Sequence, residues 1–129
     1  ADRIGVSGSS QGGGFALMLA GLVPRFRAAA ANVPAFCDFG GEKSGWPQFR
    51  RHGFDRMQLF DAAYFAARIQ CPVRMIAGWR DEVCPPESVY AAYNCVNAPK
   101  EIIDEPSMAH EIWPSYGRLQ QWLKEELKG

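Results

Sequence analysis

The chain has 129 residues, 47% of them hydrophobic, and its 14 basic and 14 acidic side chains cancel to a formal net charge of zero. A domain of this length buries roughly two-thirds of its unfolded surface, so we expect one domain over residues 1–129. With balanced charge, the chain has no excess of basic residues that would favour binding to nucleic acid or an anionic membrane. No apolar stretch approaches the ~20 residues of a membrane span, and no secretory signal precedes the first strand, which together predict a cytoplasmic location.

The first predicted strand ends in a tight turn that contains glycines. Residues 3–7 predict a strand, and the pentapeptide GSSQG at residues 8–12 joins it to a helix over 11–23. This is the G-x-S-x-G pattern of a nucleophile elbow, with Ser10 at its apex. We expect both of its glycines to be required because a side chain would clash in so tight a turn. The backbone N–H of Gln11 then points at the place where an oxyanion would form.

Other glycine-rich turns fit this segment less well. A Walker loop requires a lysine before its serine or threonine, and none is present here. The run Gly12–Gly14 also misses the G-x-G-x-x-G spacing of a dinucleotide-binding loop. An ordinary strand-to-helix loop remains the alternative to a catalytic elbow.

An alanine-rich strand and an aromatic insertion follow. Residues 27–32 predict a second strand that packs closely against a covering helix. Residues 36–59 appear as an irregular insertion, and a short helix is expected over 61–69 with Asp61 at its N-terminus. The aromatic side chains of this region fit stacking on sugar rings, or packing against the sheet or a neighbouring subunit: Phe36, Phe39, Trp46, Phe49, Phe54 and Phe60.

Residues 72–78 predict the third strand, and an acidic residue of the triad is expected in the loop after it. Asp81 lies in the loop that follows, and Glu82 is its nearest rival. Two prolines stiffen this loop and begin a helix over 86–96, so the carboxylate would be held in place.

Residues 100–104 predict the fourth strand, and a histidine that acts as the base is expected after it. His110 follows that strand, whereas His52 precedes any suitable acid. The order serine, acid, histidine is that of α/β-hydrolases, and it selects His110. A final amphipathic helix has an apolar face composed of Tyr116, Leu119, Trp122, Leu123 and Leu127.

The alternation of strands and helices predicts the α/β class, with a mostly parallel sheet of about four strands covered by helices on both faces. Four cysteines (Cys37, Cys71, Cys84 and Cys95) form no C-x-x-C pair and have no histidine at zinc-ligand spacing. The sequence signals a structural disulfide pattern only weakly, so we expect reduced thiols and no metal site.

Four segments, at residues 8–13, 32–38, 81–86 and 110–111, resemble the acetyl xylan esterase and cephalosporin C deacetylase family, carbohydrate esterase family seven. The resemblance implies the C-terminal half of an α/β-hydrolase that removes acetyl groups from sugars and related small esters. It implies a triad of Ser10, Asp81 and His110, with Glu111 as the second residue of the family's His-Glu pair, and no cofactor. Members of this family are usually intracellular oligomers.

The chain also departs from that family. Members are far longer, and their upstream Arg-Gly-Gln motif and second oxyanion N–H have no counterpart here. Trp79 and Arg80 stand where members have small or apolar residues. In full-length members the first strand is paired on both sides, so one edge is expected to be bare here. Bare edges recruit partners, which predicts a homo-oligomer.

The function expected from these observations is hydrolysis of acetyl esters by a serine esterase. Two alternatives stay open. One is a non-catalytic fragment or assembly module that retains the triad residues by descent. The other is a serine peptidase or acyl transferase, because this fold alone does not determine the substrate.

Overall fold

The core of the molecule is a parallel sheet with the strand order β1-β2-β3-β4. The computed structural model describes residues 3–41, 54–112 and 115–129. Its four strands are β1 (Gly5–Ser9), β2 (Ala28–Asn32), β3 (Val73–Gly78) and β4 (Lys100–Glu105). Each neighbouring pair is parallel, so the carboxyl ends of all four strands lie at one edge of the sheet. This confirms the predicted four-stranded parallel sheet.

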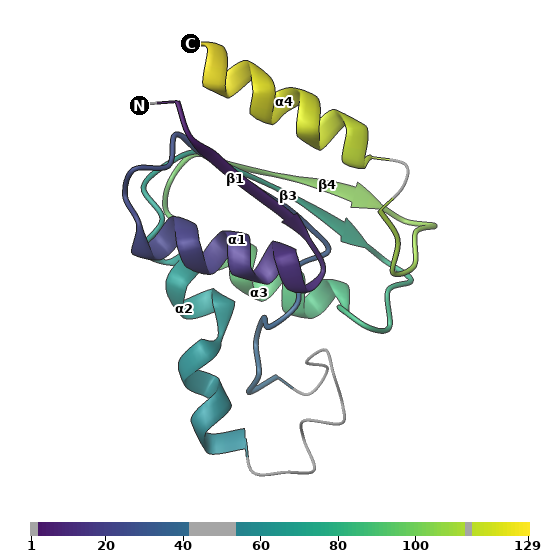
Figure 1. The fold of residues 1–129 in the computed structure, drawn as a ribbon. Coiled ribbons are helices and arrows are strands. Elements are labelled where there is room, and N and C mark those ends of the chain that lie inside the picture. The colour runs from purple at the N-terminus through teal and green to yellow at the C-terminus, as the bar shows by residue number, and fades with distance from the viewer. Residues whose placement is uncertain (1–2, 42–53, 113–114) are drawn as a thin grey trace.

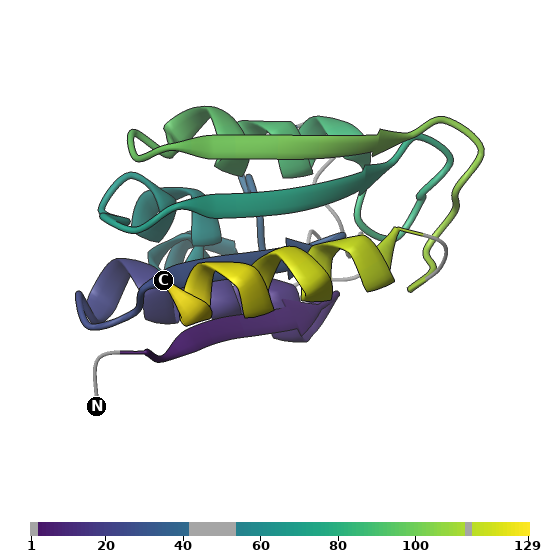
Figure 2. The same cartoon turned by 90° about the horizontal axis from the view of Figure 1, so that it is seen from above.

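Helices cover both faces of the sheet, as expected from the sequence (Figure 1). One face packs against α1 (Gln11–Leu22), α2 (Ala62–Ala66) and α3 (Pro86–Cys95). Among the described helices only α4 (Tyr116–Lys128) packs against the opposite face, and it lies over the sheet along the strands in Figure 2. Leu119 and Leu123 of α4 are buried there, and Tyr116, Trp122 and Leu127 pack around them.

The alanines of β2 explain how closely these layers pack. Ala28 and Ala30 face α4, whereas Ala29 and Ala31 face the other helices, and all four side chains are completely buried. Small side chains on both faces of a central strand let the helix backbones come close. At Gly21 of α1, a Cβ would lie 2.2 Å from the carbonyl oxygen of Phe65, so that crossing excludes any side chain.

The segment after β2 is fastened by Asp61, which caps α2 as predicted. Its carboxylate accepts hydrogen bonds from the backbone N–H groups of Ala63, Asp38 and Phe39 at 2.8–2.9 Å. The insertion was expected to be irregular to residue 59, which is wrong at its end, because Phe54–Phe60 form a 3-10 helix, η2. Residues 42–53, which include Trp46, Phe49 and His52, lie outside the described residues.

The described aromatic side chains of the insertion differ in how far they are buried. Phe39 is buried, and the Phe36 ring lies 5.4 Å from that of Phe15 and 6.0 Å from that of Phe39. These residues cover the helices beside the sheet, whereas Phe60 is 58% exposed.

Among the helices described by the structure, none is long and apolar enough to cross a membrane.

Candidate active site

Ser10 lies at the sharp turn between β1 and α1. Its φ of 55° and ψ of −118° are a backbone conformation that residues other than glycine rarely adopt. Three hydrogen bonds hold the turn: the Ser10 N–H donates to the carbonyl of Asn32 at 2.9 Å, and the Ser10 carbonyl accepts from Gly14 at 3.0 Å and from Ala35 at 2.8 Å. The strained turn is therefore fixed by neighbours on both sides.

Only one of the two elbow glycines is required for the close approach of this turn. A Cβ at Gly8 would lie 2.1 Å from the carbonyl oxygen of Gly12. A Cβ at Gly12 itself would meet nothing within 4 Å, so our expectation for that residue was wrong. The reason is that Gly12 already belongs to α1 and faces open space. The second tight contact is at Gly14, where a Cβ would lie 2.3 Å from the carbonyl oxygen of Ala35.

The three side chains selected from the sequence come together at the carboxyl edge of the sheet. Ser10 Oγ lies 2.8 Å from His110 Nε2, and His110 Nδ1 lies 2.8 Å from Asp81 Oδ2. A carboxylate can only accept a hydrogen bond, so Nδ1 carries a proton and Nε2 is free to accept the serine proton. The His110 side chain is 29% exposed and that of Asp81 is completely buried.

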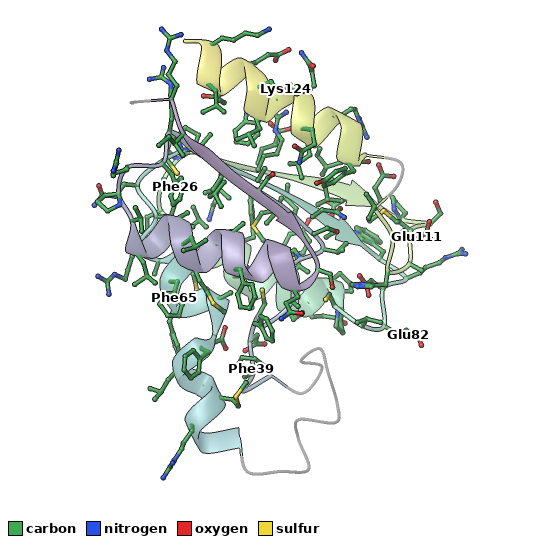
Figure 3. All side chains as sticks on the ribbon, in the orientation of Figure 1. Phe26, Phe39, Phe65, Glu82, Glu111 and Lys124 are labelled. Atoms are coloured by element: carbon green, nitrogen blue, oxygen red, sulfur yellow. The ribbon has the colours of Figure 1, made fainter. Side chains whose placement is uncertain are left out.

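Backbone groups of its own loop hold the carboxylate of Asp81. Its second oxygen, Oδ1, accepts from the N–H of Val83 at 2.9 Å and from the N–H of Cys84 at 2.8 Å. The rival acid, Glu82, is exposed and lies beyond the carboxyl end of β3 (Figure 3). The structure thus brings Asp81, rather than Glu82, to His110.

The N-terminus of α1 lies directly beside Ser10. Gln11 is the first residue of this helix, so its N–H has no acceptor within the helix. The partial positive charge of a helix N-terminus favours negative charge nearby. An oxyanion formed at Ser10 would be adjacent to this N–H, and the role of Gln11 as its donor stays a prediction.

Cys84 also lies at the site, although we expected no catalytic role for it from the sequence. Asp81, Cys84 and His110 each offer a metal-ligand atom, and these atoms lie within 4.8 Å of one another. However, burial, followed by the nearby charge of Asp81, raises the pKa of the Cys84 thiol to about 12. The thiol is therefore protonated near neutral pH, and a protonated thiol is a poor nucleophile. The D-x-x-C spacing within one loop is the signal that could have placed it here.

Asn32 is the second residue beside the triad that sequence reasoning missed. It is completely buried at the end of β2 and hydrogen-bonds to residues adjacent to Ser10 and His110. A single polar residue that ends a strand composed of alanines is the signal that could have identified it.

The fold, with a serine, an imidazole and a carboxylate on loops at the carboxyl ends of a parallel sheet, is that of an α/β-hydrolase. The family model described as acetyl xylan esterase (AXE1) matches residues 1–42 and 47–126. The acetyl esterase Axe7A of Xylanibacter ruminicola is 38% identical over 135 residues, covering 95% of this chain and 31% of that protein. The chain belongs to the acetyl xylan esterase family.

Two solved structures show the same relationship. Acetyl xylan esterase 1 from Thermoanaerobacterium sp. JW/SL YS485 is 33% identical with a TM-score of 0.84, covering 99% of this chain and 46% of that one. The acetyl xylan esterase from Paenibacillus sp. R4 is 32% identical with a TM-score of 0.82, covering 97% and 46%. The chain thus spans less than half the length of these relatives.

Proposed function

We propose that this chain carries the catalytic residues of a serine esterase that hydrolyses short-chain acetyl esters, such as those of acetylated sugars. The observation that carries the proposal is the continuous hydrogen-bonded path from Ser10 Oγ through the His110 ring to the Asp81 carboxylate. Membership of a family of acetyl xylan esterases supports the ester as substrate and acetyl as the acyl group.

In the proposed reaction, His110 Nε2 removes the proton from Ser10 as Oγ attacks the acetyl carbonyl carbon. Asp81 holds the imidazole in the required tautomer and stabilises its charged form. The tetrahedral intermediate collapses, the alcohol leaves with the proton from His110, and the acetyl group stays on Ser10. Water, activated by the same imidazole, then releases acetate. These steps use no metal and no organic cofactor.

The oxyanion in this mechanism is stabilised by the N–H of Gln11. A second donor, which the resemblance places upstream of the nucleophile, would have to come from another segment or another copy of the chain. Loss of one oxyanion donor typically lowers turnover by about 10²–10³. We therefore expect the isolated chain to hydrolyse activated esters slowly.

The proposed partner is a second copy of this chain, giving a homo-oligomer. Among the described residues β1 pairs with β2 alone, because it is the first strand in the sheet order. The helix that follows β1 also has exposed apolar side chains, with Phe15, Leu19 and Leu22 exposed by 46%, 44% and 53%. An unpaired strand edge next to apolar surface favours association.

The test is hydrolysis of p-nitrophenyl acetate, p-nitrophenyl butyrate and a peptide p-nitroanilide by the chain and by Ser10→Ala. We expect the acetate ester to have the highest kcat/KM and the serine variant to lose this activity. Hydrolysis by Ser10→Ala at the parent rate would remove Ser10 from the mechanism. A preference for the peptide would instead favour a peptidase.

A further inference from the structure

Asn32 links the two loops that carry Ser10 and His110. Its side-chain amide donates one hydrogen bond to Ser9 Oγ at 2.8 Å and another to the backbone carbonyl of Glu111 at 3.1 Å. Ser9 directly precedes the serine of the triad, and Glu111 directly follows the histidine. Glu111 lies at the carboxyl edge of the sheet in Figure 3. A second connection therefore runs parallel to the Ser10–His110 hydrogen bond, one residue away on each side.

The orientation of the Asn32 amide is fixed by its partners. A carbonyl oxygen can only accept, so the amide nitrogen must face Glu111, and the alternative flipped orientation would lose that hydrogen bond. The amide oxygen Oδ1 is buried and has no hydrogen-bond partner among the described residues. Burying an acceptor without a hydrogen-bond partner destabilises the folded chain. An apolar residue at position 32 would avoid this cost. What asparagine offers in its place is an amide nitrogen that donates two hydrogen bonds.

The backbone of Asn32 contributes to the same connection. Its carbonyl accepts the N–H of Ser10, so main chain and side chain of one residue hold the nucleophile turn and the histidine loop. The other end of the histidine loop is fixed by Met108, which is buried and whose carbonyl accepts from the N–H of Arg80 at 3.0 Å. His110 thus lies between one anchor before it and one after it.

We propose that Asn32 is a positioning residue that holds His110 Nε2 within hydrogen-bonding distance of Ser10 Oγ. The inference rests on the proposed esterase function, because it concerns the same site. Asn32 acts through Ser9 and Glu111, and its burial keeps it away from substrate. A misplacement of about 1 Å in a catalytic group can lower the rate about 10²-fold. Removal of the amide therefore lowers kcat and leaves KM unchanged.

The test compares Asn32→Leu with Ser9→Ala. The leucine side chain has nearly the shape of asparagine and donates no hydrogen bond. We expect it to lower both kcat for p-nitrophenyl acetate and the rate of Ser10 modification by a fluorophosphonate about 10–100-fold. Ser9→Ala removes only one of the two hydrogen bonds of the amide and should lower both rates less than Asn32→Leu does. If Asn32→Leu does not fold, Asn32→Ala replaces it. An equal rate in the parent and the folded Asn32 variant would overturn the proposal.

A stability control separates positioning from folding. Val96 is buried and follows α3 at the edge of the sheet opposite the triad, so Val96→Ala destabilises the fold without touching the site. We expect Val96→Ala to keep its kcat at temperatures where it is folded, even if it unfolds earlier than the asparagine variant. A matching loss of kcat in Val96→Ala would show that the effect of Asn32 is one of stability alone.

A second readout does not depend on turnover. In a His52→Gln background His110 is the only histidine, and its Nδ1 proton can be followed by NMR. We expect this proton to be protected from exchange with water in the parent and to exchange faster in Asn32→Leu. Equal exchange in both would contradict the proposal. A parent that does not react with the fluorophosphonate would instead contradict the esterase function, and the NMR comparison would still test Asn32.

Discussion

The carboxyl edge of the sheet and the side of β1 that faces away from β2 differ in how many of their groups have interaction partners among the described residues. At the carboxyl edge, Ser10, His110 and Asp81 are joined by hydrogen bonds of 2.8 Å, and the second oxygen of Asp81 has two backbone donors. On the other side, β1 has one neighbouring strand, and Leu22 of α1 is 53% exposed. In the described residues the three side chains of the triad are thus hydrogen-bonded to one another, although β1 has one neighbouring strand.

The largest expected effect tests the well-paired region. Asp81→Asn should lower kcat about 10⁴-fold, because an amide in place of the carboxylate favours the wrong imidazole tautomer. The matched control is Glu82→Gln, which changes the adjacent exposed carboxylate in the same way. Steady-state kinetics with p-nitrophenyl acetate measures both. Equal losses in the two variants would contradict the assignment of Asp81.

The second prediction concerns stability at the glycines behind the nucleophile. Gly14→Ala should lower the free energy of unfolding by about 1–3 kcal/mol, because the new Cβ would overlap the carbonyl of Ala35. Gly12→Ala meets nothing within 4 Å and should raise it by about 0.5–1 kcal/mol, as alanine is the better helix former. Urea unfolding followed by circular dichroism compares them. The reverse order would show that the packing of α1 on the 33–38 segment is wrong.

The third prediction tests the unpaired side. If β1 and α1 associate with another copy, Leu19→Lys should weaken self-association about tenfold by removing apolar area from the interface. Lys124→Ala, on the exposed surface of α4, should leave association unchanged. Analytical ultracentrifugation measures both dissociation constants. A chain that is monomeric at all concentrations would refute the proposed homo-oligomer.

The smallest effect is a change in the pH dependence of stability. The pKa of the Cys84 thiol rises from 9.0 to about 12 on folding, so between these values the unfolded chain has lost a proton that the folded chain keeps. The free energy of unfolding therefore falls as the pH rises through this range. Cys84→Ala should make that decline shallower, leaving the contributions of Cys37, Cys71 and Tyr90, whose pKa values burial also raises. An unchanged decline would mean that Cys84 is not buried.

Much of this arrangement was predictable because the signals are local. The strand before Ser10, the turn of residues 8–12 and the order of Asp81 and His110 along the chain require only neighbours in sequence and the topology of parallel sheets. The hydrogen bonds of Asn32 to Ser9 and Glu111 were not predictable, because they depend on how distant loops meet, whereas the position of Cys84 near Asp81 follows from their shared loop. The role of Gly12 was misjudged for the same kind of reason: a pattern shows where a glycine occurs, whereas only the packing shows what its Cβ would touch.

The most direct test of the account is chemical modification of Ser10 in this chain alone. Treatment with a fluorophosphonate, followed by peptide mass mapping, should give one adduct on Ser10, and His110→Ala should abolish it while retaining the circular dichroism spectrum of the parent. A folded parent that gives no adduct would contradict the claim that this chain assembles an activated serine.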